Sequence, residues 1–373
     1  MKIIHVISGL SKGGGERIAV ELSNQAVNNG DKVVIVAGWP ENPDFLQNSI
    51  NPQVEIKFVA KKKSTAFLNI LFWVLKNRKW IVTYDILHCH LTFGAVFGSI
   101  TQVILKNILQ KKRPFIIETN HSVGMSIPKL SRWLQAMMLS QRDGIILMAK
   151  DPYWTKFMTN HPRLKSKIIA NGISIPVAPQ SEKTEQTFNV TISPSCKYLV
   201  GTVSMLRPDR KPWLYIPIFK SVYEALGDAV HFVIAGGGIE SSTIKTLIEE
   251  QGLSNNVSMP GIVNNPTSLI SHMDMYVSVS VGATGGISMI EAAMCNTPVI
   301  AIQLTENYKT KNQDWFWSHT DINEVAKKII FLLQNDEKRN ELIRNQNKFV
   351  NKHLTTEAMH SSYHSFYEEL LQP

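Results

Sequence analysis

Cysteine is scarce in this 373-residue chain: Cys89, Cys196 and Cys295 lie far apart, with no CxxC and no Cys/His spacing of the kind that a structural zinc site needs. A disulfide framework or a structural zinc site would need several such residues at short, regular spacings. The scarcity argues against both and favours a reducing, cytoplasmic compartment.

Long hydrophobic runs are missing as well. The longest apolar stretches, residues 66–75 and 93–105, contain polar interruptions and fall short of the roughly 18 residues that indicate a membrane span. The first ten residues lack the extended apolar core and small-residue cleavage site of a signal peptide. We therefore expect neither export nor a transmembrane helix.

Apolar residues are nevertheless plentiful, at 44% of the chain, and 373 residues exceed what one core usually supports. Short β-rich runs alternate with helical segments over residues 2–148 and again over residues 198–302. This alternation predicts an α/β fold with two doubly wound parallel sheets. Residues 176–194 are rich in Pro, Ser, Thr, Glu and Gln, so we expect a linker there between domains at 1–175 and 195–354.

Positive charge gathers in the first half of the chain. The net charge is +9, and residues 1–180 carry 23 Lys and Arg against 10 Asp and Glu. Basic blocks at 61–63, 76–79 and 111–113 flank apolar segments, a pattern typical of a surface attracted to anionic lipid. Solvated helix ends would give the same composition. No nucleic-acid motif accompanies the charge, so we do not expect nucleic acid as a partner.

Glycines dominate the first strand-to-helix loop, where Gly13, Gly14 and Gly15 precede Glu16. Glycines let the backbone approach a ligand, and the following helix directs its first N–H groups toward it. The loop therefore predicts an anion or hydroxyl site, the alternative being a flexible turn. It matches neither GxGxxG nor a Walker loop, which disfavours hydride transfer and NTP hydrolysis.

Three cations, Arg207, Arg210 and Lys211, follow the strand predicted at residues 198–203. Ligands of open parallel sheets gather at the carboxyl ends of strands, and cations there suit a diphosphate.

Two more loops of the second half follow apolar strands. Glycines that include Gly237 follow the strand ending at residue 235, and again permit close backbone approach. In residues 280–301, Gly285 and Gly286 precede a helix with a single carboxylate, Glu291.

Together with residues 85–90, 171–173 and 256–261, these motifs stand in an order that resembles GT-B glycosyltransferases of the family 4 type, which are retaining enzymes that use nucleotide-sugars. The resemblance covers nearly the whole chain. It implies two Rossmann-like domains facing across a cleft, with acceptor contacts mainly in the first and donor contacts mainly in the second. It also implies that a last helix, at residues 355–371, packs back on the first domain. The motifs are residues 13–16, 85–90, 171–173, 201–211, 234–238, 256–261 and 280–301.

The resemblance also assigns roles to the second-domain residues. Glu291 would accept hydrogen bonds from the ribose of the donor, whereas a solvated surface glutamate is the alternative. Backbone N–H groups at Thr284, Gly285 and Gly286 would approach the donor's sugar and diphosphate. The remaining donor residues would be Gly14, Gly15, Arg210 and Gly237, and Lys211 and Arg207 would stabilise the leaving diphosphate.

On the acceptor side the resemblance places Gly13, Glu16 and His121. The imidazole of His121 would lie near the reacting sugar and hydrogen-bond a hydroxyl. We expect the catalytic group to comprise His121, Lys211, Arg207 and Glu291, whereas His88 and His90 are interpreted as structural or as part of the cleft wall.

Two positions depart from the family pattern. Ala283 stands where relatives often carry a glutamate that contacts the donor sugar, and Met205 stands where they often carry an arginine. No carboxylate nucleophile is evident, so retention is expected through a front-face reaction in which the leaving diphosphate takes the acceptor's proton. The chain has no Asp-x-Asp triplet, so a divalent metal is expected to be dispensable and no cofactor is expected.

The expected activity is therefore sugar transfer from a nucleotide-sugar to a hydroxyl of a glycan or lipid-linked acceptor, in cell-surface polysaccharide or glycolipid synthesis. The enzyme would be cytoplasmic or peripheral on the inner face of the membrane. Two alternatives stay open. One is a nucleotide-sugar epimerase of the same architecture, and the other is a non-catalytic sugar- or lipid-binding relative.

Overall fold

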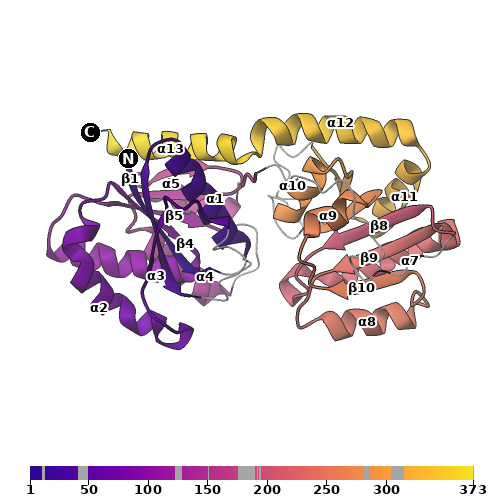
Figure 1. Cartoon of the computed structure of the whole chain (residues 1–373), viewed down its shortest axis with the longest axis horizontal. Coiled ribbons are helices and arrows are strands. Elements are labelled where there is room, and N and C mark those ends of the chain that lie inside the picture. Colours follow the sequence, from indigo (N-terminus) through magenta and orange to yellow (C-terminus); the bar gives the residue numbers. More distant parts are fainter. Residues whose placement is uncertain are drawn as a thin grey trace. The chain divides into compact units, whose positions relative to one another are not determined.

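The computed structural model divides the chain into two compact units, one of Met1–Ser174 with Thr355–Pro373 and one of Ile175–Leu354 (Figure 1). Of the predicted linker at 176–194, only Val190 and Ile192 belong to the described residues. These are 1–10, 13–40, 49–121, 128–149, 151–174, 190, 192, 195–280, 286–303 and 315–372.

The first unit is built on seven parallel strands in the order β3-β2-β1-β4-β5-β6-β7. The central strands are buried along most of their length, as expected of a parallel sheet covered by helices on both faces. Their bounds are β1 (Lys2–Gly9), β2 (Lys32–Trp39), β3 (Glu55–Phe58), β4 (Ile86–His90), β5 (Phe115–Asn120), β6 (Gly144–Leu147) and β7 (Lys165–Ile168). The α-helices between them are α1 (Gly14–Asn28), α2 (Lys63–Ile81), α3 (Leu91–Thr101), α4 (Lys129–Leu139) and α5 (Pro152–Thr159).

The last helix, α13 (Thr356–Leu371), belongs to the first unit and packs against α1 (Figure 1). Its start is fixed by Thr355, whose side chain accepts a hydrogen bond from the N–H of Ala358 and whose backbone pairs with Ile173. Its buried face consists of Met359, Tyr363, Phe366, Tyr367 and Leu370 together with smaller neighbours.

The second unit repeats the architecture with six parallel strands in the order β10-β9-β8-β11-β12-β13. The strands are β8 (Tyr198–Val203), β9 (Val230–Ala235), β10 (Val257–Gly261), β11 (Met275–Ser280), β12 (Val299–Gln303) and β13 (Trp317–His319). The helices are α7 (Tyr215–Leu226), α8 (Ser241–Glu250), α9 (Pro266–Ser271), α10 (Ile287–Met294), α11 (Ile322–Leu333) and α12 (Asp336–His353). The predicted fold class, two Rossmann-like domains with parallel sheets, is confirmed.

One helical stretch is longer than the sequence suggests. Helix α3 continues into a π-helix, η2 (Gln102–Ile108), so that Leu91–Ile108 reaches 18 residues, enough by length and hydropathy to cross a bilayer. Phe93, Phe97 and Leu105 from this stretch are fully buried in the core of the first unit. We interpret it as a core helix, and the expectation that no stretch was long enough is wrong because the π-helix continues the helix beyond α3.

Candidate active site

Two loops of the second unit are joined where their strands end. Strands β8 and β9 are parallel neighbours, so their carboxyl ends share one edge of the sheet. The N–H of Ser204 donates to the carbonyl of Ala235 (2.9 Å), and the N–H of Leu206 donates to the carbonyl of Gly237 (3.0 Å). The N–H of Glu240 returns a bond to the carbonyl of Leu206 (3.0 Å). The loop after β8, which carries the three cations, and the glycine-rich loop after β9 thus form a single surface.

Glycine is required at this junction. Gly236 has φ +129°, and a Cβ there would collide with the carbonyl oxygen of Ser204. At Gly237, the position singled out from the sequence, a Cβ would come no closer than 3.1 Å to the side chain of Ile262. The close backbone approach therefore occurs beside Gly237 rather than at it.

The three cations of the loop after β8 differ in their ion pairs. Arg207 forms a two-pronged pair with Asp209, with Nε and Nη2 lying 3.0 and 2.8 Å from the two carboxylate oxygens. Arg210 lies 3.8 Å from the same carboxylate. Lys211 is exposed and has no ion-pair partner among the residues that the structure describes.

Lys211 also has an unusual backbone, with φ +46° and ψ 52°. A non-glycine residue in the left-handed region is strained, and such strain is concentrated at ligand-binding sites. The side chain that is expected to meet the diphosphate is thus held by a specific turn between two short 3-10 segments, Pro208–Arg210 and Pro212–Leu214.

Glu291 lies on α10, whose amino end is capped by the extended residue Gly286. The Glu291 side chain is only 4% exposed, so it is not a solvated surface glutamate. Burial, and secondarily the proximity of Glu291, raises the pKa of Cys295 to about 11. Thr284 and Gly285, as well as Ala283, lie outside the described residues.

The first unit presents its glycine loop at the start of α1. Gly13 caps the helix, and a Cβ there would collide with the carboxylate of Glu16, which is itself buried. A Cβ on Gly15 would lie 2.7 Å from Cδ2 of Leu91, whereas Gly14 is exposed. The first turns of α1 and α3, the helices that follow β1 and β4, are therefore in direct contact.

His121 directly follows β5, and behind it lies a cluster of buried histidines. Its Nε2 is 3.2 Å from Nδ1 of His90, and Nε2 of His90 is 3.1 Å from Nδ1 of His5. His88 is hydrogen-bonded on both ring nitrogens, to the hydroxyls of Tyr367 and Thr119, each at 2.7 Å.

The cluster is electrically neutral at physiological pH. Burial lowers the pKa of His5 to about 3 and that of His121 to about 4, and it lowers the pKa of His88 and His90 well below the ordinary value. Neighbouring histidines lower the pKa of His5, His88 and His90 further.

Sequence reasoning did not include His5, and it assigned no chemistry to His88 or His90. A signal was available, because residues two apart on a strand share one face. The HCH run therefore places two imidazoles on one side of β4, and His5 is the register partner of His88.

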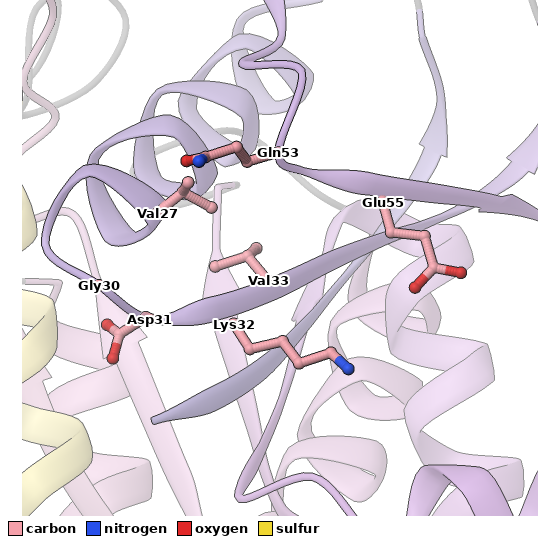
Figure 2. Close-up of a pocket in the computed structure, with 7 residues that line it drawn as sticks. All are labelled: Val27, Gly30, Asp31, Lys32, Val33, Gln53 and Glu55. Atoms are coloured by element: carbon pink, nitrogen blue, oxygen red, sulfur yellow. The ribbon is translucent and has the colours of Figure 1, made fainter.

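A hollow of about 450 Å³ occurs elsewhere in the first unit, as Figure 2 shows. Its lining includes Lys32 and Glu55, the first residues of β2 and β3, so it lies at the amino edge of the sheet. Asp31 at its wall forms an ion pair with the amino group of Met1. The candidate site residues of the first unit lie at the opposite, carboxyl edge of this sheet.

Two family models match consecutive parts of the chain. Residues 12–173 match Glycosyltransferase Family 4, and residues 183–349 match Glycosyl transferases group 1.

Curated proteins that are similar in sequence are also named as glycosyltransferases. A poly(ribitol-phosphate) alpha-N-acetylglucosaminyltransferase of Staphylococcus aureus is 28% identical over 172 residues, which cover 45% of this chain and 32% of that protein. The chain thus aligns with about a third of the length of that relative. The O-antigen biosynthesis glycosyltransferase WclY of Escherichia coli is 21% identical over 314 residues, 80% of this chain and 79% of that protein.

Solved structures share the whole architecture. Anabaena HepE, solved with UDP and glucose, superposes with a TM-score of 0.76 at 16% identity, covering 99% of this chain and 100% of that one. S. aureus TarM, solved as a variant with UDP, alpha-GlcNAc-glycerol and Fondaparinux, gives 0.74 at 15% identity, covering 98% and 99%. The two family models together span most of the chain and place it among the glycosyltransferases, and the similar structures show that its fold is of the GT-B type.

Proposed function

We propose that the protein is a retaining glycosyltransferase that moves a sugar from a nucleotide-sugar to a hydroxyl of a glycan or lipid-linked glycan. By their names, the curated relatives are a poly(ribitol-phosphate) alpha-N-acetylglucosaminyltransferase and an O-antigen biosynthesis glycosyltransferase, and the similar structures of HepE and TarM were solved with UDP. These point to surface-polysaccharide synthesis and make a UDP-sugar the first donor to test.

The observation that carries the proposal is the state of Lys211. It is an exposed cation without a carboxylate partner in the described structure, on a strained turn beside the glycine loop at the carboxyl edge of the second sheet. A diphosphate needs a fixed positive charge of this kind, and its own charge grows as the glycosidic bond breaks. Glu291, on the helix that follows β11 at the same edge, would accept hydrogen bonds from the ribose.

In the proposed reaction the acceptor hydroxyl attacks the anomeric carbon from the face that the diphosphate leaves. The leaving diphosphate takes the hydroxyl proton, and Lys211 and Arg207 stabilise its negative charge. His121, held neutral by burial, would orient a sugar hydroxyl. No step requires a divalent metal or another cofactor.

We further propose that the protein is cytoplasmic and binds the inner face of the membrane peripherally through helix α2. One side of α2 exposes large apolar residues to solvent, while basic blocks at 61–63 and 76–79 lie at its two ends. An apolar face flanked by lysine and arginine suits an anionic bilayer surface, where a lipid-linked acceptor would be found. The exposed residues are Phe67, Leu68, Leu71, Phe72 and Leu75.

Incubation with a panel of UDP-sugars and other nucleotide-sugars, with and without a lipid-linked acceptor extract, tests the proposal. Nucleotide release that depends on the acceptor and yields a glycosylated product with retained anomeric configuration supports it. Release of nucleotide with an epimerised free sugar and no need for acceptor would instead identify an epimerase. Binding without turnover would identify a non-catalytic relative.

A further inference from the structure

Three histidines from three neighbouring strands form a continuous chain of contacts in the first unit. His5 comes from β1, His90 ends β4 and His121 follows β5, and the two ring-to-ring distances are 3.1 and 3.2 Å. His5 and His90 are at most 1% exposed. The chain therefore runs from the carboxyl edge of the sheet into the core.

The polar groups around this chain are mostly engaged in a separate network. His88 packs on His90 with ring centroids 4.0 Å apart, but its nitrogens bond Thr119 and Tyr367. The hydroxyl of Tyr363 lies 3.2 Å from that of Thr119. His360, also on α13, is 3.1 Å from Asn29.

A neutral imidazole has one nitrogen that donates and one that accepts. His90 therefore can donate to only one neighbour while it accepts from the other, so the chain has a direction. If His90 donates to His121, the remaining ring nitrogen of His121, Nδ1, is a donor. If His121 donates to His90, that Nδ1 is an acceptor. A switch between the two requires all three rings to change tautomer together.

A metal ion is the competing explanation, since nitrogen atoms of His5, His88 and His90 lie within 4.8 Å of one another. Both nitrogens of His88 are already hydrogen-bonded to hydroxyls at 2.7 Å. Nδ1 of His5 and Nε2 of His90 lie 3.1 Å apart, which is a hydrogen-bond distance. The observed contacts favour a hydrogen-bonded chain.

We propose that His90, supported by His5, is a positioning residue that holds His121 in a single neutral tautomer, so that its Nδ1 meets a substrate hydroxyl in one fixed hydrogen-bonding role. The effect on turnover rests on the proposed transferase function. The tautomer itself does not, and it can be measured without substrate.

Two substitutions of the same residue separate positioning from packing. In His90→Asn the amide occupies the place of Nδ1 and keeps a partner for His121. In His90→Gln the amide reaches the place of Nε2, which keeps the link to His5 and removes the link to His121. Both replace the ring by a similar polar side chain, so a merely structural role predicts similar damage from each. Tyr367→Phe, which removes a hydroxyl from His88 alone, is a further control.

The experiment is ¹⁵N NMR of histidine-labelled protein between pH 6 and 8, with metal analysis of the same samples. We expect His121 to be one tautomer in the parent, His90→Asn and Tyr367→Phe, and a mixture of both tautomers in His90→Gln. If the protein transfers sugar, kcat should fall about 10-fold or more in His90→Gln, with the donor KM within about 2-fold of the parent, and by less in His90→Asn.

Identical His121 signals in both His90 variants would overturn the proposal. One equivalent of zinc in the parent protein, lost in both variants, would also overturn it in favour of a metal site. A mixture of tautomers in His90→Gln without any transferase activity in the parent would leave the positioning role standing and refute the proposed function alone.

Discussion

Arg207 and Asp209 are locked together two residues apart, with the guanidinium bonding both carboxylate oxygens at 3.0 and 2.8 Å. Both side chains are about 40% exposed, so the pair itself stabilises the fold little. It nevertheless places a negative charge beside the cations that are proposed to bind diphosphate.

Asp209→Asn should therefore strengthen nucleotide binding. Removing the carboxylate frees Arg207 and Arg210 and removes repulsion, so the affinity for a nucleoside diphosphate should rise by about 2- to 5-fold, the range set by exposed ion pairs. Calorimetric titration with UDP measures this. The control is Asp228→Asn, which changes a carboxylate in the 3-10 turn Gly227–Ala229, just before β9 and at the opposite edge of the sheet. Weaker binding by the Asp209 variant would mean that the carboxylate positions the arginines for the ligand.

Lys211→Ala should reduce turnover more than donor affinity. The lysine would meet charge that grows in the transition state, so kcat should fall by about 100-fold or more, as with other preorganised charges. Turnover at saturating donor is the measurement. Lys245→Ala, an exposed lysine on α8, should leave kcat unchanged. If the Lys211 variant retains its turnover, the leaving group is stabilised elsewhere.

Glu291→Gln should reduce donor affinity more than turnover. The ribose changes little during the reaction, so loss of the charged acceptor should weaken nucleotide binding by about 1–3 kcal/mol and leave kcat at saturating donor near that of the parent. Titration with UDP, compared with turnover, tests the difference between the two variants. If the Glu291 variant binds UDP as tightly as the parent, the ribose does not bind at α10.

The double variant Leu68→Asp/Phe72→Asp should detach the protein from membranes. These residues are 81% and 70% exposed on α2, and burying each large apolar side chain contributes roughly 1.5–3 kcal/mol. Sedimentation with phosphatidylglycerol vesicles should show binding of the parent that falls with added salt, and at least about 10-fold weaker binding of the variant. Phe331→Asp, an exposed apolar residue on α11, should bind like the parent. Parent binding that ignores lipid charge and salt contradicts the assignment.

Mild acid should loosen the first unit before the second. The buried imidazoles of His5, His88 and His90 have a lowered pKa, whereas in the unfolded chain they protonate below about 6.5. Between pH 6 and 5 the unfolded state thus binds more protons, so stability falls with falling pH, by about 1.4 kcal/mol per unit for each of these histidines. Hydrogen exchange of β1 and β4, corrected for the intrinsic rate, should accelerate relative to β11 and β12. Equal acceleration in both units would contradict this.

Local patterns in the sequence were enough to predict much of this protein. The alternation of apolar strands and helices determines two parallel sheets, because each element must bury its own apolar face. Strand-exit loops could also be recognised, since glycines and cations were concentrated in them. Lys211 and Glu291 could be singled out in this way. The sequence did not show that the backbone of Gly236, and not that of Gly237, is the one that comes close to another loop, because the neighbour is Ser204 in the loop after β8.

Only the tertiary structure decided which side chains meet. His5 and His90 are 85 residues apart, and their contact exists because β4 pairs with β1 in a sheet whose order is not the order of the chain. Likewise Tyr363 and Tyr367 reach Thr119 and His88 only because α13 packs on the first unit. Hydrogen bonds of this kind depend on distances of about 3 Å, which strand order and helix packing set and local periodicity does not.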